Sequence, residues 1–198
     1  RDGYAGEIWP DNPRYSAIDG VKCYPDIASL PHAPDMAIIA VAAARAEEAA
    51  AELGAKGCPV AIIFSSGFGE LGPEGKLLER SLVATARANG IRICGPNTLG
   101  LICAFHKAPA TFSQYADTPP LAGPVGFTSQ SGAFGTAISA LARSRGLGFG
   151  YFVSTGNTAD ISPVEVMREM LNDERIKVLA GYLEGLSDGE ELIALASE

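Results

Sequence analysis

Residues 124–145 of the chain read PVGFTSQSGAFGTAISALARSR. The apolar start predicts a buried strand over residues 124–128, and the alanine-rich end predicts a helix over residues 133–145. Between them, Ser129–Gly132 consists of small and capping residues, as in a tight turn that leads into a helix. A strand, a turn and a helix in this order indicate an α/β fold.

The turn is also a candidate anion site. Gly132 and Ala133 are small, so they leave the N–H groups of the first helical turn uncovered. Ser129 and Ser131 can cap those donors or share them with a ligand. Because free N–H groups and the helix dipole both favour negative charge, the turn suits a phosphate or carboxylate. An ordinary capped helix start explains the same residues, and this stretch alone leaves both readings open.

Composition excludes several classes of protein. The chain has 198 residues, of which 47% are hydrophobic and 19% charged, which fits one large globular domain or two small ones. The net charge of −8 argues against nucleic-acid binding, which needs clustered positive charge. No apolar run is long enough to span a bilayer, so we expect no membrane partner and a cytoplasmic protein.

Cysteine and histidine usage gives no sign of a disulfide framework or a metal site. The four cysteines are far apart without a CxxC pair, so we expect them to be reduced and to fill the core. Only His32 and His106 are present, which excludes a histidine-rich metal site, and we expect no bound metal.

Strand and helix patterns alternate in two blocks. The first block predicts strands over 35–41, 59–64, 91–94 and 99–104, with helices over 73–89 and over 43–53, the latter ended by Gly54. Before it we expect short strands over 6–10 and 21–24 and a helical turn over 26–30. The second block predicts strands over 124–128, 148–154 and 176–183, with helices over 133–145, 163–172 and 188–198. Such alternation implies right-handed βαβ units.

The two blocks predict two domains. We expect an α/β chain of two consecutive three-layer domains with mainly parallel sheets, over residues 1–105 and 124–198. Residues 106–123 carry Pro109, Pro119 and Pro120 and read as a linker, part of which could pair as a strand. The first block has no opening strand with a glycine loop, and the last helix has no capping residue, so we expect both domains to be incomplete.

A glycine-rich loop follows the second strand of the first block. Gly67–Gly72 fits GxGxxG, which suggests a dinucleotide-binding loop. That site needs an acidic residue about 20 positions later, and the next strand instead runs into Cys94–Pro96. An NAD site, a loop that contacts another ligand, and a plain strand-to-helix connection remain as alternatives.

Small and polar residues follow several other predicted strands, at the edge where α/β sheets bind ligands. Ser65, Ser66 and Gly67 form one such end, and Val41, Ala42 and Ala43 form another. Asn157 and Asp160 form a polar loop that can face the Ser129–Gly132 turn, although turn-forming residues explain it equally well. Glu184 ends a strand, where it can orient a histidine or simply face solvent. Arg14 can reach a phosphate or lie solvated on the surface.

Four of these segments together resemble a known superfamily. They are Gly95–Gly100 (GPNTLG), Ser129–Ala133 (SQSGA), Ser154–Asp160 (STGNTAD) and Tyr182–Gly185 (YLEG). The chain resembles, over nearly its whole length, the CoA-binding and first ligase domains of the NDP-forming acyl-CoA synthetases, which include the succinyl-CoA synthetase α subunit. The resemblance implies a Rossmann-like CoA-binding domain followed by a flavodoxin-like domain.

The resemblance also implies roles for residues. It implies that CoA is bound by Arg14, Val41, Ala42, Phe64, Ser65, Ser66 and Asn97. The phosphate of a phosphohistidine or acyl phosphate would be held by Ser129, Ser131, Gly132 and Ala133, with Ala133 and Asn157 next to the acyl substrate. Glu184 would hold the phosphorylated histidine.

The superfamily makes acyl-CoA from a small carboxylic acid, CoA and a nucleoside triphosphate. Its glycine loop should precede Arg1 and its phosphorylated histidine should follow Glu198, and Thr98 stands where many relatives have cysteine. The resemblance places ATP/ADP or GTP/GDP with Mg²⁺ on an ATP-grasp domain or subunit, and we expect an oligomer. The alternatives are a non-catalytic CoA-sensing module fused to an acyltransferase, and an NAD-binding oxidoreductase.

Overall fold

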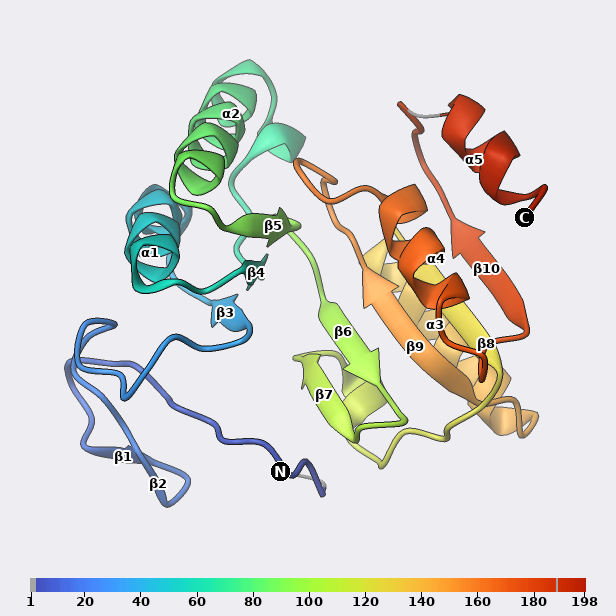
Figure 1. Ribbon diagram of the computed structural model, residues 1–198, viewed down its shortest axis with the longest axis horizontal. Coiled ribbons are helices and arrows are strands. Elements are labelled where there is room, and N and C mark those ends of the chain that lie inside the picture. The colour runs from blue at the N-terminus through green and yellow to red at the C-terminus, as the bar shows by residue number, and fades with distance from the viewer. Residues whose placement is uncertain (1–2, 188) are drawn as a thin grey trace.

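The computed structural model describes residues 3–187 and 189–198. It contains two α/β units side by side, each built on its own sheet (Figure 1). None of the helices within these residues is both long and apolar enough to cross a membrane. Within the same residues, no three His, Cys, Asp or Glu side chains are grouped so that they could hold a metal ion. The four cysteines are free and buried, as predicted.

The first unit is a parallel sheet with both of its helices on one face. The strands lie in the order β3-β4-β5 and are β3 (Ala37–Ile39), β4 (Val60–Ile63) and β5 (Arg92–Cys94). The helices are α1 (Ala43–Lys56) and α2 (Pro73–Ala88), which pack against each other. A short 3₁₀ helix, η1 (Gly69–Leu71), lies in the loop before α2.

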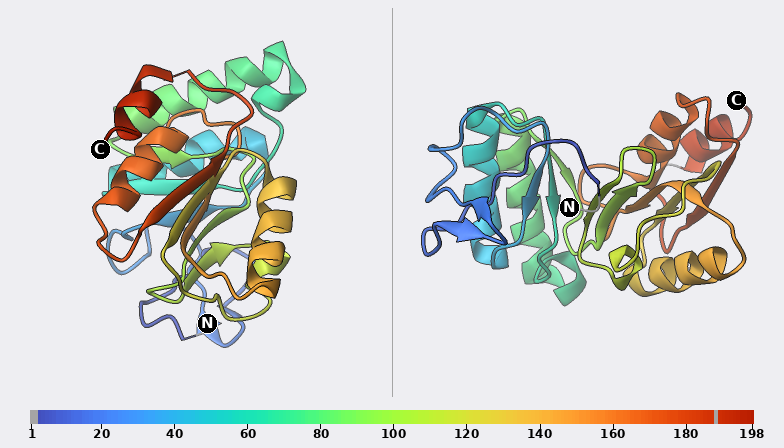
Figure 2. Two further views of the ribbon diagram at one scale, coloured as in Figure 1. Left: turned by 90° about the vertical axis from the view of Figure 1, so that its right-hand side faces the viewer. Right: turned by 90° about the horizontal axis from the view of Figure 1, so that it is seen from below.

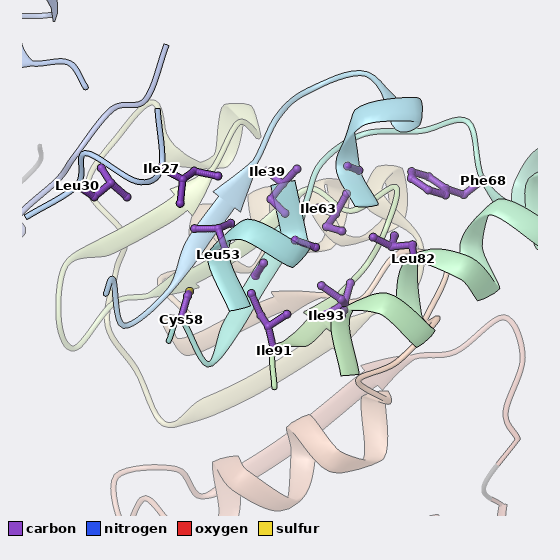
Figure 3. Close-up of a cluster of buried hydrophobic side chains, with 14 residues drawn as sticks. Ile27, Leu30, Ile39, Leu53, Cys58, Ile63, Phe68, Leu82, Ile91 and Ile93 are labelled. Atoms are coloured by element: carbon purple, nitrogen blue, oxygen red, sulfur yellow. The ribbon is translucent and has the colours of Figure 1, made fainter. Parts of the chain in front are cut away.

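Alternate strand residues build the core of this unit. Ile39, Ile63 and Ile93 point to the helical face and meet Leu53 and Leu82 (Figure 3). Each of these side chains is at least 95% buried, which is worth about 1.5–3 kcal/mol for an aliphatic residue. This alternation is what turns three short apolar runs into one sheet with a packed face.

Helix α1 ends later than the sequence predicted. Gly57, with a φ of 98°, forms the left-handed cap, and its N–H donates to the carbonyl of Gly54. Gly54 lies inside the helix. The position requires glycine because a Cβ there would be 2.6 Å from the carbonyl oxygen of Asn89. Close approach of the two helices therefore explains Gly54, and the predicted end at Gly54 was wrong.

The N-terminal residues also differ from expectation. No strand forms over residues 6–10, and the next residue, Asp11, makes only an isolated bridge to Tyr24. A hairpin of β1 (Ala17–Ile18) and β2 (Val21–Lys22) forms instead, and only its second strand was predicted. Asp26 accepts a hydrogen bond from the N–H of Ser29 at 2.8 Å, and the N–H of Leu30 donates to the carbonyl of Ile27 at 3.3 Å, so a single turn capped by Asp26 forms as predicted.

The second unit is a five-stranded sheet with helices on both faces. Its strand order is β10-β8-β9-β6-β7. The parallel strands are β8 (Val125–Ser129), β9 (Phe149–Ser154) and β10 (Val178–Tyr182). The helix α3 (Gly132–Ser144) covers one face, and α4 (Pro163–Leu171) and α5 (Gly189–Leu195) cover the other (Figure 2).

The second sheet contains two further strands that the sequence analysis did not assign to the second domain. The strand β6 (Gly100–Cys103), predicted for the first domain, pairs antiparallel with β9, and β7 (Ala108–Thr111) lies inside the predicted linker and pairs with β6. Residues 106–123 also contain the 3₁₀ helix η2 (Gln114–Ala116). The division between residues 105 and 106 therefore does not coincide with the division between the sheets. A four-residue apolar strand fits either sheet, so its sequence carries no signal for the choice.

The two units pack directly on each other. The face of the first sheet away from its helices presents Ile62 and Cys94, which pack with Ala110 and, at the edges, Leu101 and Val153 of the second sheet. The second sheet thus covers this face, where a further layer of helices was expected for the first domain. The contact fixes how the loops of the two units meet.

Asp160 ties the units together at one end of this contact. Its side chain is fully buried and accepts hydrogen bonds from Arg87 at 2.6 and 2.9 Å, from Arg92 at 2.9 Å and from the N–H of Ile93 at 2.8 Å. Burial alone would raise the pKa of Asp160, but the hydrogen bonds from Arg92, Ile93 and Arg87 outweigh it and lower the pKa. The charged Asp160 carboxylate of the second unit therefore binds three groups of the first unit and links the two units.

Replacing Asp160 with asparagine should destabilise the protein by about 2 kcal/mol, less than for a wholly buried pair because the two arginines stay hydrated. Because folding lowers the pKa of Asp160, its stabilisation is complete above the unfolded value of about 3.9 and is lost as the pH falls through the folded value. Urea midpoints at pH 7 and pH 3 test this. The midpoints of wild type and Asp160→Asn should differ more at pH 7 than at pH 3, and an equal difference at both pH values would contradict the stabilising role of the Asp160 carboxylate.

Candidate functional site

The carboxyl ends of strands from both sheets open into one polar cavity of about 530 Å³. Because parallel strands end at a common edge, the loops after β4, β5, β8, β9 and β10 all reach it. The residues that line it are Glu70, Asn97, Gln130, Gly156, Asn157, Thr158, Ser162, Pro163, Glu184, Gly185, Leu186 and Ser187. Three predicted site residues, Asn97, Asn157 and Glu184, thus meet in one place.

The start of α3 lies beside this cavity, immediately after Gln130. The Ser131 hydroxyl caps the helix by accepting from the N–H of Phe134 at 3.4 Å. The Ser129 hydroxyl is buried and donates to the carbonyl of Ser131 at 2.8 Å, so it shapes the turn. Among the described residues, no partner accepts from the N–H groups of Ser131, Gly132 or Ala133. Three adjacent free amides at a helix start form a nest that favours an anion.

The surroundings of the nest explain its small residues. A Cβ on Gly132 would lie 2.9 Å from Cγ of Leu99, so only glycine allows this approach. Ala133 and Phe134 are exposed, and the Phe134 ring stacks on Tyr182 at a centroid distance of 4.1 Å. Leu99 closes the nest on one side, and the Ala133 side of the helix start stays open.

Glu184 presents a free carboxylate to the cavity. Its side chain is exposed, and no hydrogen bond or ion pair reaches its carboxylate from the described residues. Its N–H donates to Oε1 of Gln130 at 2.5 Å. A carboxylate in this position can accept from an imidazole N–H, the chemistry that orients a histidine.

Gln130 is a cavity residue that the sequence analysis did not single out. It was part of the Ser-Gln-Ser-Gly segment, but a polar residue in a turn carries no signal for long-range contacts. Its side chain bonds to residues 158, 184 and 185, so it connects the loops after β9 and β10.

Asn157 joins the two units. Its Nδ2 donates to Glu70 at 2.6 Å and to Glu79 at 2.8 Å, and its Oδ1 accepts from Asn97 at 3.2 Å. Both amide donors of Asn157 are therefore used within the protein, and the adjacent carboxylates disfavour a second negative group there. This geometry assigns Asn157 to the contact between the units and leaves no free donor for a substrate carboxylate.

The glycine-rich loop is likewise satisfied by its own carboxylates. Glu70 accepts from the N–H groups of Gly67 at 2.5 Å and Phe68 at 3.2 Å, and Glu79 accepts from Gly69 at 3.2 Å. Burial would raise the pKa of Glu70, but these bonds and the one from Asn157 lower it. Because a pyrophosphate would need the same amides, the loop is unsuited to the dinucleotide that GxGxxG suggested.

The remaining predicted residues gather at the ends of β3 and β4. The Ser65 hydroxyl donates to the carbonyl of Val41, and a Cβ on Gly67 would lie 3.2 Å from the Cβ of Ala43. Helix α1 begins at Ala43. Its N-cap residue, Ala42, provides no side-chain cap, and its first turn contains no acidic residue. The start of α1 is therefore a second helix start without a side-chain cap, and the residues around it at the edge of the first sheet are small.

Phe64 and Ser66 also lie at the end of β4, whereas Arg14 lies in the N-terminal segment before β1. Phe64 packs edge-on against Phe112 at a centroid distance of 4.9 Å, and Ser66 is exposed. Arg14 is exposed, and its N–H donates to Oδ1 of Asn12 at 3.0 Å. None of these three residues lines the 530 Å³ cavity. The predicted site residues therefore divide into a group at or beside this cavity, a group at the ends of β3 and β4, and Arg14.

Two family models together match nearly the whole chain. Residues 2–104 match the CoA binding domain, and residues 122–198 match the succinyl-CoA ligase like flavodoxin domain. Two curated relatives are ADP-forming ligases. The chain is 39% identical to the α subunit of acetate–CoA ligase I of Pyrococcus furiosus, over 99% of this chain and 43% of that protein. It is 30% identical to 4-hydroxybutyrate–CoA ligase of Nitrosopumilus maritimus, over 97% of this chain and 27% of that protein.

A solved structure agrees. The apo form of the dinucleotide forming acetyl-coenzyme A synthetase 1 of Candidatus Korarchaeum cryptofilum superposes with a TM-score of 0.92 at 34% identity, covering 98% of this chain and 42% of that one. The chain thus spans less than half the length of each of these proteins. The chain belongs to the NDP-forming acyl-CoA synthetase superfamily, as a CoA binding domain followed by a succinyl-CoA ligase like flavodoxin domain.

Proposed function

We propose that this chain is the CoA-binding and acyl-phosphate-binding part of an acid–CoA ligase that forms a nucleoside diphosphate. The observation that carries the proposal is the nest of free amides at Ser131–Ala133, next to a cavity where the loops of both units meet. The chemistry is a transfer in which the CoA thiolate attacks the acyl carbon and phosphate leaves with the bonding electrons.

The first unit supplies a surface suited to CoA. The uncapped start of α1, with small residues at Ala42, Ser65 and Ser66, lets a ligand lie close to the backbone and offers free N–H groups to a phosphate. Arg14 is exposed and adds a positive charge in the N-terminal segment. Residues 41–43 and 64–66 would hold the cofactor, and CoA supplies the thiol.

The second unit supplies charge stabilisation. In the transfer, negative charge develops on the departing phosphate, and preformed amide donors stabilise that charge without reorganising. In this proposal the nest at the start of α3 takes this role. The free Glu184 carboxylate would orient a histidine that carries the phosphoryl group, supplied by another part of the protein. ATP or GTP, with Mg²⁺, would be bound by an ATP-grasp domain or subunit outside the present chain segment.

Calorimetric titration of CoA into the full-length protein tests the first half of the proposal. CoA should bind, and Arg14→Ala should weaken binding about fivefold, the effect of losing roughly 1 kcal/mol from one exposed charge-assisted contact. Arg145→Ala, an exposed arginine at the end of α3, is the matched control and should leave affinity unchanged. Absence of any heat with CoA, or binding of NAD in its place, would refute the assignment.

A further inference from the structure

Gln130 makes more side-chain hydrogen bonds across the cavity than a turn residue needs. Its Oε1 accepts from the N–H of Glu184 at 2.5 Å and from the N–H of Gly185 at 2.9 Å. Its Nε2 donates to the carbonyl of Gly185 at 2.9 Å and to the Thr158 hydroxyl at 3.2 Å. One half-buried amide therefore connects the turn before α3 to the loops after β9 and β10.

The orientation of this amide is fixed by its partners. Backbone N–H groups can only donate and a carbonyl can only accept, so Oε1 must face Glu184 and Nε2 must face the Gly185 carbonyl. The backbone N–H of Gln130 also donates to the carbonyl of Tyr182 at 3.0 Å, which extends the pairing of β8 with β10 by one residue. Both the backbone and the side chain of Gln130 therefore form hydrogen bonds with the segment that follows β10.

The same amide contacts a strained residue. Thr158 has a φ of 58°, an uncommon value for a β-branched residue, which other contacts must hold in place. Its hydroxyl accepts from Gln130 and lies 3.3 Å from both the Thr155 hydroxyl and the Gly156 carbonyl. Strain held by a hydrogen-bond network next to a cavity is a mark of a prearranged site.

We infer that Gln130 is a positioning residue that holds the backbone of Glu184 and Gly185 so that the Glu184 carboxylate faces the cavity. The inference rests on the proposed function, because it assigns Glu184 the task of orienting the phosphoryl-carrying histidine. Gln130 itself touches no substrate. It acts through the direction in which the chain leaves β10, and a displacement of about 1 Å there is enough to lower a rate severalfold to a hundredfold.

A double-mutant cycle on the full-length protein tests this. Gln130→Ala should lower kcat for acyl-CoA formation roughly tenfold to a hundredfold, with little change in the KM for CoA. In a Glu184→Gln background the same change should cost almost nothing further, because the positioned carboxylate is already gone. Gln130→Glu keeps the side-chain volume and the acceptor for both N–H groups, but its second oxygen repels the Gly185 carbonyl, so an intermediate loss is expected.

The matched control is Gln114→Ala, an exposed glutamine in η2 that is not among the cavity-lining residues, which should leave kcat unchanged. Equal losses from Gln130→Ala in both backgrounds would mean a general structural role and would overturn the inference, as would full activity in Gln130→Ala.

Hydrogen exchange separates this inference from the proposed function. In Gln130→Ala the amides of Glu184 and Gly185 should exchange about tenfold faster or more, because each loses its acceptor. If the protein binds no CoA and makes no acyl-CoA, the proposed function fails while the exchange result still judges the geometry. Unchanged exchange at residues 184 and 185 would overturn the positioning role whether or not the ligase assignment holds.

Discussion

Ser131→Pro should reduce acyl-CoA formation by the full-length protein about 10²–10³-fold, the range seen when one preformed donor to a developing oxyanion is lost. Proline removes the Ser131 N–H, which has no partner among the described residues, and it restricts the backbone of Gln130 before it. The nest would lose one of its three donors. Steady-state rates with acetate, CoA and ATP measure the effect.

Ser131→Ala is the matched control for this change. It removes the cap to Phe134, a loss of about 1 kcal/mol in stability, and it keeps the N–H group. The alanine variant should therefore retain activity to within a fewfold, whereas the proline variant should not. Equal activities of the two variants would show that the Ser131 amide has no part in catalysis.

Glu184→Gln should lower transfer of the phosphoryl group to histidine about 10²–10⁴-fold, the scale of losing a carboxylate that orients a catalytic imidazole. Glutamine keeps the shape and the backbone contact to Gln130, but it lacks the negative charge that stabilises an imidazolium and fixes its tautomer. Incorporation of ³²P from labelled ATP into acid-labile phosphoprotein measures this step.

The ³²P labelling of the Glu184→Gln variant also distinguishes a ligase from a CoA-sensing module. A sensor needs the CoA surface of the first unit and is indifferent to Glu184, so CoA affinity should be unchanged by Glu184→Gln under either reading. Glu190→Gln in α5 is the control, since Glu190 is exposed and lies outside the cavity lining. Normal labelling in Glu184→Gln would remove the histidine-orienting role and favour the sensor.

The elements with strong periodic patterns could be predicted from the sequence. Helix α3 and the strands β4, β8 and β9 lie within about two residues of their predicted bounds. The strand β6 was assigned to the wrong sheet, because pairing with β9 depends on tertiary contacts that a run of four residues does not encode. The end of α1 was misplaced because Gly54 serves a helix contact and not a cap.

The site was predictable only in outline. The nest, Glu184 and Asn97 follow from where strands end, since parallel strands bring their carboxyl ends together. The partners of Glu70, Asn157 and Gln130 were not predictable, because each bonds to residues more than 25 positions away. For the same reason the GxGxxG pattern was misleading, since Glu70 at the fourth position of its own motif binds the loop amides.

Backbone amide NMR of the full-length protein tests the central claim most directly. Addition of inorganic phosphate or acetyl phosphate should shift the ¹H signals of the Ser131, Gly132 and Ala133 amides downfield in a saturable way, because each would gain an anionic acceptor. The amides of Gly67, Phe68 and Gly69, already bonded to carboxylates, should stay in place. Saturable shifts at residues 67–69 with none at residues 131–133 would contradict the account.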